Sequence, residues 1–175
     1  MRLPSALLLL PLLILAGCAD TQKLNINNKF GAVRLDSNAS AYVAMPADGG
    51  FGNKVYYGSG AMVASIVERA LFVHLVRVVI GTKAEGISKA KMSAASGRYK
   101  YLFFPTIVHW EDRATGWSGR ADKVKVNIAV IDVESGKQIS FASIDGRSGL
   151  ATLGGDRPQD LLPGPINQYI AQLFY

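Results

Sequence analysis

The stretch Lys123-Val-Lys-Val-Asn-Ile-Ala-Val-Ile-Asp-Val133 alternates apolar and polar side chains, and it becomes apolar on both faces from Ala129 onward. Successive side chains of a strand point to opposite faces, so this spacing predicts a strand with one buried face. Glu134-Ser-Gly-Lys137 is typical of a tight turn, after which Gln138–Ile144 returns as an antiparallel partner. We expect this hairpin to be central in the fold. The side chains expected in its core are Val124, Val126, Ile128 and Val130.

Three further strands are predicted before this hairpin. Tyr99–Trp110 is rich in aromatic and β-branched residues, and Pro105 within it favours an edge position or a bulge. Arg77–Gly81 is a short β-branched run, and Ser40–Met45 is a strand that ends before a proline. The segment 46–60 holds five glycines and is predicted to be a long loop.

Helical spacing of apolar residues predicts three helices. The first runs from Ala61 to about Leu75, with Ser59 as its N-cap. A short second helix covers residues 87–96 and is closed by Gly97. Pro158 opens the last helix. The buried stripe predicted for this last helix consists of Leu161, Leu162, Ile166, Tyr169, Ile170, Leu173 and Phe174.

The elements therefore follow the order β-α-β-α-β-β-β-α. Strands separated by helices favour parallel crossovers early in the chain, and the hairpin adds antiparallel strands late. This order predicts an α/β (α+β) fold with a mixed β-sheet and helices packed on it. We find no internal repeat, and residues 31–175 are expected to form a single domain.

The N-terminus has the organisation of an export signal. Met1-Arg2 is positive, and the apolar run Leu3–Leu15 is too short to span a bilayer comfortably as a mature helix. The sequence Leu15-Ala-Gly-Cys18 follows and resembles the lipobox of bacterial lipoproteins. The resemblance implies that residues 1–17 are a signal peptide and that Cys18 carries diacylglycerol and an N-acyl chain. No other cofactor is expected.

Lipidation sets the expected location and partners of the chain. Residues 18–30 are polar and rich in asparagine, so we expect them to tether the domain to the membrane. Ala19, rather than aspartate, follows Cys18, which favours the outer membrane and a periplasm-facing domain. The chain after residue 17 has 18 Lys and Arg against 13 Asp and Glu, a net charge of +5. This modest excess fits contact with anionic lipid headgroups or cell-wall groups, and nucleic acid is not an expected partner.

Several strings extend the resemblance beyond the lipobox. They are Arg98-Tyr-Lys-Tyr-Leu with Pro105, His109-Trp-Glu-Asp-Arg113-Ala-Thr-Gly-Trp117-Ser, Ile131-Asp-Val-Glu-Ser-Gly136-Lys, Gly154-Gly-Asp-Arg-Pro-Gln-Asp-Leu-Leu162 and Pro165-Ile-Asn-Gln-Tyr169. They look like a family of small Gram-negative lipoproteins with an uncharacterised domain, over roughly residues 33–175. The element order alone is also similar to the curli-secretion lipoprotein and to lipoprotein activators of penicillin-binding proteins. The family resemblance implies no activity.

The segment His109–Arg113 has the highest density of chemically active side chains. His109, Glu111 and Asp112 could ligate a metal or transfer protons. The favoured alternative is a strand end at which Arg113 pairs with a local carboxylate and Trp110 packs on the facing strand. His74, on an apolar helix stripe, is expected in the core.

Exposed aromatics and arginines are the candidate partner-binding residues, because such side chains give large contact energies at interfaces. Trp117 lies in a glycine-containing loop and either anchors a partner or folds back on Trp110. The glycine runs before the first helix match no phosphate-binding or dinucleotide-binding motif, and Gly146-Arg-Ser-Gly149 lacks the spacing of a nucleophile elbow. The candidates are Trp117, Arg120, Trp110, Arg113, Phe51, Tyr56 and Tyr57.

Three classes of function remain open at this point. A non-catalytic interaction or assembly module that binds an envelope protein is favoured. A domain that binds cell-wall glycan or lipid through its aromatic loops is the alternative. An enzyme is the least favoured class, because no acid–base pair or nucleophile set is visible in the sequence.

Overall fold

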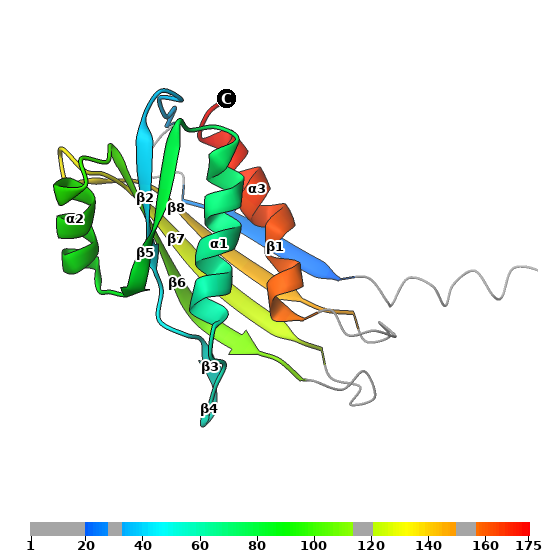
Figure 1. Cartoon of the computed structure of the whole chain (residues 1–175). Coiled ribbons are helices and arrows are strands. Elements are labelled where there is room, and N and C mark those ends of the chain that lie inside the picture. Colours follow the sequence, from blue (N-terminus) through cyan, green and yellow to red (C-terminus); the bar gives the residue numbers. More distant parts are fainter. Residues whose placement is uncertain (1–19, 28–32, 114–120, 150–156) are drawn as a thin grey trace, which may run out of the picture.

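A computed structural model describes residues 20–27, 33–113, 121–149 and 157–175 (Figure 1). The long strands all belong to one mixed sheet, and two short strands form a separate hairpin. The strands are β1 (Thr21–Ile26), β2 (Ser40–Met45), β3 (Gly50–Phe51), β4 (Lys54–Val55), β5 (Arg77–Ala84), β6 (Tyr101–Glu111), β7 (Lys123–Asp132) and β8 (Gln138–Arg147). The helices are α1 (Ser59–Phe72), α2 (Ile87–Ser96), the 3-10 helix η5 (Pro158–Leu161) and α3 (Pro163–Gln172).

The sheet has the strand order β1-β8-β7-β6-β2-β5. β2 runs parallel to both β5 and β6, whereas β6, β7, β8 and β1 pair antiparallel. The predicted fold class, with early parallel crossovers and a late antiparallel hairpin, is therefore confirmed. Pro105 pairs with Ile128 of β7 but lies beyond Phe103, the last β6 residue that pairs with β2. Because β2 does not pair with Pro105, the missing N–H of proline removes no hydrogen bond between β6 and β2.

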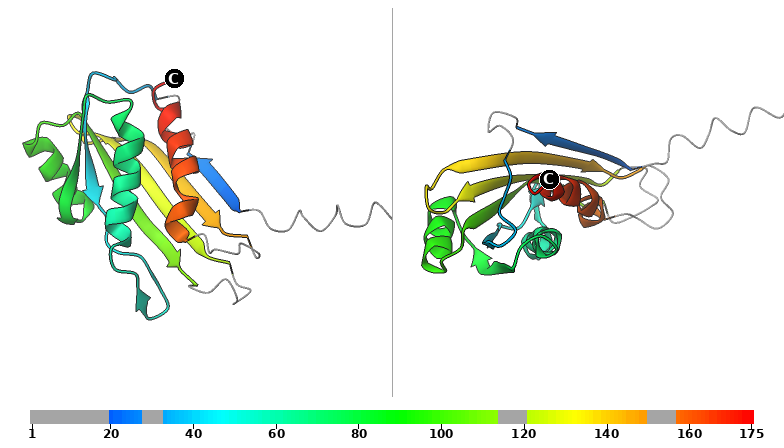
Figure 2. Two further views of the ribbon diagram at one scale, coloured as in Figure 1. Left: turned by 45° about the vertical axis from the view of Figure 1, so that its right-hand side comes forward. Right: turned by 90° about the horizontal axis from the view of Figure 1, so that it is seen from above.

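Two apolar clusters lie on opposite faces of the sheet. α1 and α3 lie side by side on one face (Figure 2), where they cover the predicted stripe of β7. That stripe and the stripe of the last helix are both buried, as predicted. α2 covers the opposite face at β2 and β6, where Tyr42, Ala90 and Leu102 form a second cluster.

The rest of that second face, across β6, β7, β8 and β1, has no helix on it in the described part of the chain. We call this surface the open face.

The expected tether is wrong for residues 21–26. This segment is strand β1, which pairs with β8 from Thr21 opposite Arg147 to Ile26 opposite Ala142. Only Leu24 and Ile26 of this strand pack on the core, so its alternation is too sparse to distinguish from a polar linker. The pairing shortens the link between Cys18 and the folded domain.

Two local expectations are corrected, one for the start of α1 and one for the segment before it. Ser59 does not cap α1: the N-cap is Gly58 in a left-handed conformation, and the Ser59 hydroxyl instead accepts the N–H of Gly49. Gly97 is the C-cap of α2, as predicted, and the next residue, Arg98, has the left-handed backbone, with φ of 56°. Segment 46–60, expected to be a loop, contains the hairpin β3–β4.

Candidate functional site

The hairpin β3–β4 and the ends of four strands meet at one end of the sheet. The register places Glu111 of β6 opposite Lys123 of β7, Lys123 opposite Arg147 of β8, and Arg147 opposite Thr21 of β1. We call this row and the attached hairpin the Glu111 end. The connection that contains residues 114–120 also leaves and rejoins the described chain here, between Arg113 and Ala121.

Glu111 is the centre of an ion network at this end, although its side chain is only 2% exposed. Its carboxylate pairs with the guanidinium of Arg113, lies 3.3 Å from Nε2 of His109, and lies 3.9 Å from Nζ of Lys123. Burial alone raises the pKa of Glu111, but hydrogen bonds from His109 and Arg113 and the nearby positive charges outweigh it. The net effect is a lowered pKa, so Glu111 is held in its ionised form.

The hairpin is fastened to this network from several sides. The ring of Phe51 meets the ring of His109 edge-on at 5.2 Å, and the Arg113 guanidinium lies 5.8 Å from the centre of the Phe51 ring. Tyr56 donates its hydroxyl proton to the carbonyl of Asp112 at 3.1 Å. A Cβ at Gly49 would stand 2.6 Å from Cβ of Trp110, so only glycine allows this approach.

Asp122 and Ser148 close the other side of the Glu111 end. Asp122 accepts the backbone N–H of Arg113, and its own N–H donates to the Ser148 hydroxyl at 2.8 Å. Desolvation raises the pKa of Asp122 more than its hydrogen bond to Arg113 lowers it. Ser148 is buried, so it serves this contact and is not an exposed nucleophile. Gly146 is required by packing, since a Cβ there would stand 2.8 Å from Leu161.

The predicted binding residues differ in their exposure in the structure. Phe51 and Tyr57 are exposed, the latter at 86%, and Tyr56 and Arg113 are partly buried. Trp110 is the correction: it is buried against the α1 side of the sheet, so it belongs to the core and presents nothing to a partner. Three predicted residues lie outside the described part of the chain, namely Cys18, Trp117 and Arg120.

The arrangement of the described side chains adds no support to the acid–base and metal hypotheses. His109 and Glu111 do meet, but no set of three or more His, Cys, Asp or Glu side chains in the described ranges is placed to hold a metal. His74 lies elsewhere, stacked at 4.7 Å on the ring of Phe174. The favoured alternative, an Arg113–carboxylate pair at a strand end, is what the structure contains.

Sequence reasoning missed a basic groove beside this network on the open face. The groove has a volume of about 800 Å³. It was missed because β1 was taken for a tether, and only β1 places Lys23 next to strands that follow it by more than a hundred residues. The lining residues are Thr21, Lys23, Val108, His109, Lys123, Val124, Lys125, Asp145, Gly146 and Arg147.

Comparisons with known proteins identify the domain family. The model for a domain of unknown function (DUF4823) matches residues 33–173. This match confirms the resemblance to a family with an uncharacterised domain. Among curated proteins, none matches the sequence.

Two solved structures illustrate the breadth of this fold. A PelC variant from Paraburkholderia phytofirmans, which forms a dodecamer, is 17% identical with a TM-score of 0.65, over 87% of this chain and 98% of that chain. A lipoprotein from Neisseria meningitidis is 13% identical with a TM-score of 0.50, over 76% of this chain and 93% of that chain. At these identities the likeness shows the fold, and the fold is thus one that a lipoprotein uses.

Proposed function

The chain belongs to the family of the domain of unknown function DUF4823, and we propose that it is a lipid-anchored, non-catalytic lipoprotein of the cell envelope. In this proposal Cys18 carries the lipid, the domain faces the periplasm from the outer membrane, and hairpin β3–β4 presents exposed aromatic residues to a protein partner. No helix in the described ranges is long and apolar enough to cross a membrane.

One observation carries the proposal: the carboxylate of Glu111 is engaged with Arg113, His109 and Lys123, and aromatic residues of the adjoining hairpin, Phe51 and Tyr57, are left exposed. The carboxylate of Glu111 is shared among Arg113, His109 and Lys123, so it is not available as a general base or a metal ligand. Two members of the same network, His109 and Arg113, also contact the ring of Phe51. A rigidly supported aromatic surface is the usual property of a binding site, and a cleft with free acid–base groups is that of an enzyme.

The exposed apolar residues of the hairpin give this surface its chemistry. Phe51, Val55 and Tyr57 are all exposed, and Lys54 stacks over the ring of Tyr56 at 4.5 Å. Clustered exposed apolar side chains with a charged rim are typical of protein-binding surfaces. The dodecamer formed by the PelC variant makes a second copy of this chain one of the partners to consider.

Site-specific crosslinking in cells tests the partner-binding surface. A photo-reactive residue at position 57 should give a discrete crosslinked product that Phe51→Ala weakens. Position 175 is the matched control, because Tyr175 is 83% exposed but lies at the opposite end of the molecule. Equal products from both positions, or a product that is insensitive to Phe51→Ala, would refute the assignment of this surface.

Palmitate labelling tests the anchor separately. The Cys18→Ser variant should lose the label, because serine cannot form the thioether. Retention of label and of membrane fractionation in that variant would refute the lipid-anchor part of the proposal. Sucrose-gradient fractionation of the unaltered chain distinguishes the outer from the inner membrane.

A further inference from the structure

We propose that the basic groove on the open face is a docking surface for the anionic phospholipid headgroups of the membrane in which the chain is anchored. The inference rests on the lipid anchor at Cys18. It adds that the folded domain itself, in addition to its lipid, binds the bilayer surface in a defined orientation.

The first step of the argument is the charge of the groove. Its lining holds four cationic side chains and one carboxylate, a net of +3. Lys125 pairs with this carboxylate, Asp145, at 3.3 Å, whereas Lys23 and Arg147 form no ion pair with any residue in the described ranges. Phosphate groups are the natural counterions for such unpaired Lys and Arg side chains.

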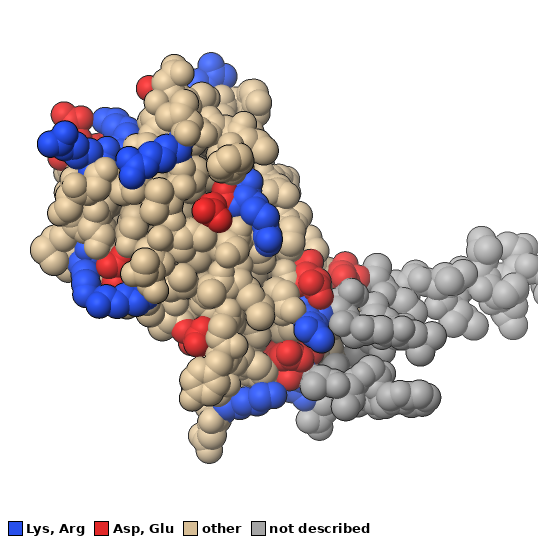
Figure 3. All heavy atoms as spheres, viewed as in Figure 1, with Lys and Arg blue, Asp and Glu red and all other residues tan. Residues whose placement is uncertain are grey.

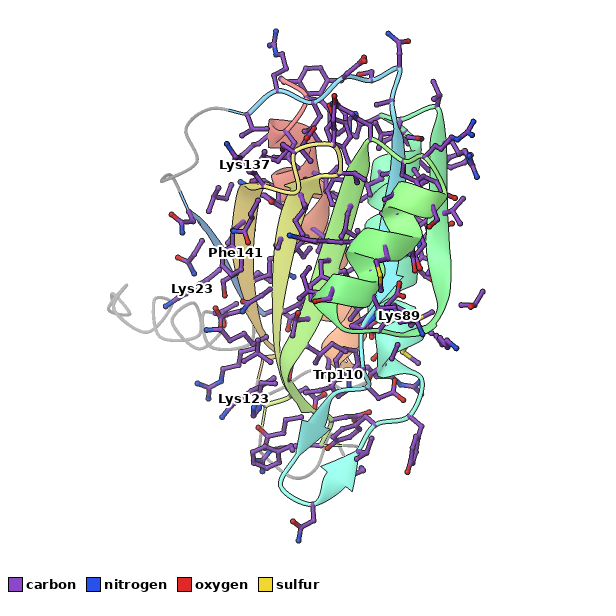
Figure 4. All side chains as sticks on the ribbon, turned by 90° about the vertical axis from the view of Figure 1, so that its left-hand side faces the viewer. Lys23, Lys89, Trp110, Lys123, Lys137 and Phe141 are labelled. Carbon is purple, nitrogen blue, oxygen red and sulfur yellow. The ribbon has the colours of Figure 1, made fainter. Side chains whose placement is uncertain are left out.

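The second step is that the cationic side chains of the groove project from the same face of the sheet. The register of β1, β8 and β7 gives Lys23, Asp145 and Lys125 the same outward parity, opposite to the buried residues of those strands. Figure 4 shows Lys23 and Lys123 projecting from β1 and β7 to the same side. By contrast, the face covered by α1 and α3 carries acidic and basic residues in small mixed groups around a broad uncharged area (Figure 3).

The third step is the distance to the bilayer. Thr21 is the first residue of β1, it lines the groove, and it follows Cys18 by three residues. Three residues span at most about 10 Å. The groove therefore begins about one Debye length from the acylated residue, within range of the negative potential of anionic lipids.

The fourth step is the choice of occupant. A soluble anionic glycan would match the charge equally well, but nothing would hold it near Thr21. The lipid anchor, in contrast, places headgroups next to the groove at a permanently high local concentration. Rigid attachment through β1 also allows the domain to keep one orientation, which a long flexible tether would not.

A fluorescence experiment on the full lipidated chain tests this surface. Because Cys18 is the only cysteine and its thiol carries the lipid, an introduced cysteine is the only free thiol. A probe on Val108→Cys reports on the groove, since Val108 lines it and is 52% exposed. A probe on Val73→Cys is the matched control, since Val73 is 77% exposed at the far end of α1.

The protein is reconstituted in phosphatidylcholine vesicles with or without phosphatidylglycerol, both containing a lipid with a quencher on its headgroup. We expect phosphatidylglycerol to increase quenching at position 108 but not at position 73, and we expect high salt to reverse the increase. No increase at position 108, or an equal increase at both positions, would overturn the proposal.

Charge variants identify the residues responsible. Each cation near an anionic surface contributes about fivefold to binding, so combining Lys23→Gln, Lys123→Gln and Arg147→Gln should weaken the phosphatidylglycerol-dependent docking by roughly a hundredfold. The control combines Lys83→Gln, Lys89→Gln and Lys137→Gln, which remove the same charge from exposed positions outside the groove. Equal losses in both variants would refute a localised surface.

Vesicle flotation of the same samples separates the two proposals. A chain that floats but shows no phosphatidylglycerol dependence keeps its anchor and refutes the docking surface. A chain that does not float refutes the anchor, and the docking surface with it. Binding of dextran sulfate to the detergent-solubilised protein, without any phosphatidylglycerol dependence in vesicles, would assign the groove to a soluble polyanion instead.

Discussion

The strands β6 and β7 carry an ion network at each end, and the two networks differ mainly in burial. At the Glu111 end, the carboxylate is almost fully buried among Arg113, His109 and Lys123. At the other end, which we call the Lys100 end, Lys100 lies 3.1 Å from both Asp132 and Glu134, and both Lys100 and Glu134 are exposed. The chemistry of the pairs is similar, but the carboxylate is buried at the Glu111 end and exposed at Glu134, so water screens the Lys100 end more strongly.

This difference in burial indicates which of the two networks stabilises the surrounding structure. The buried network supports hairpin β3–β4, and the exposed one lies beside a tight turn that Asp132 and Ser135 already close by hydrogen bonds. We therefore expect removal of the Glu111 ion pairs to affect both folding and the proposed binding surface, and removal of the Lys100 ion pairs to affect neither.

The largest effect should come from Glu111→Gln. The substitution leaves the Arg113 charge partly buried without its counter-charge, which should lower the free energy of unfolding by about 3 kcal/mol. Urea denaturation followed by circular dichroism measures this loss. A change no larger than that of a surface substitution would show that burial does not distinguish the two ends.

The pH dependence of the stability difference between the unaltered chain and Glu111→Gln tests whether Glu111 is ionised in the folded state. The pKa of Glu111 is lowered in the folded state, so its stabilising contribution is present above its ordinary pKa of 4.5 and is lost as the pH falls through the folded pKa. The stability difference between the unaltered chain and Glu111→Gln should therefore be constant near neutrality and shrink below about pH 4.5. Urea midpoints measured across this range test the sign, and a difference that grows on acidification would contradict it.

Gly49→Ala should have the next largest effect. The new methyl group would overlap Ile107 and Trp110, so the hairpin must move away from β6 at a cost of about 1–3 kcal/mol. Gly86→Ala is the matched control, because a Cβ there meets nothing and its φ of −74° suits alanine. Melting temperatures of the two variants give the comparison, and similar values would mean that the hairpin is not packed as described.

Arg98→Gly, which changes a backbone conformation near Lys100 and no ion pair, should stabilise the domain slightly. Arg98 has a left-handed backbone, which glycine adopts without steric cost, so the gain should be about 0.5–1 kcal/mol. The control Ser96→Gly, inside α2, should be destabilising. Thermal unfolding of both variants checks the signs, and a loss of stability in Arg98→Gly would indicate a role for the arginine side chain.

Lys100→Ala should have the smallest effect of the series. Hydrogen bonds to Asp132 and Glu134 raise the pKa of Lys100, but its ammonium group is exposed to solvent and the pairs are screened. We expect no resolvable shift of the urea midpoint and no change in crosslinking from position 57. A shift comparable to that of Glu111→Gln would remove the distinction between the ends.

The sequence predicted the elements whose periodicity reflects their own burial. Val126, Ile128 and Val130 alternate because one face of β7 is covered by helices, and the stripe of α3 repeats for the same reason. The Arg113–carboxylate pair was also foreseen, because both residues lie close together in the chain. Each of these predictions could be made from residues that lie close together in the sequence.

What the sequence did not predict depends on contacts between distant segments. The partner of β1 is β8, and the two apolar residues of β1 gave no reason to expect a strand. Trp110 was mistaken for a binding residue because an aromatic at a strand end looks the same whether it faces the core or solvent. The role of Ser59 depends on Gly49, which only the folded hairpin brings within reach.

The pairing of β1 with β8 also constrains the order of events when the chain is made. Thr21 is synthesised early, yet its partner Arg147 follows 126 residues later. The first strand to emerge is thus the last that the sheet can accept. Until β8 is available, β1 has no strand to pair with, so in the proposed lipoprotein the sheet does not yet hold the chain near Cys18 when the lipid would be attached. Under the proposed function, this strand order leaves time for modification of Cys18 before β1 joins the sheet.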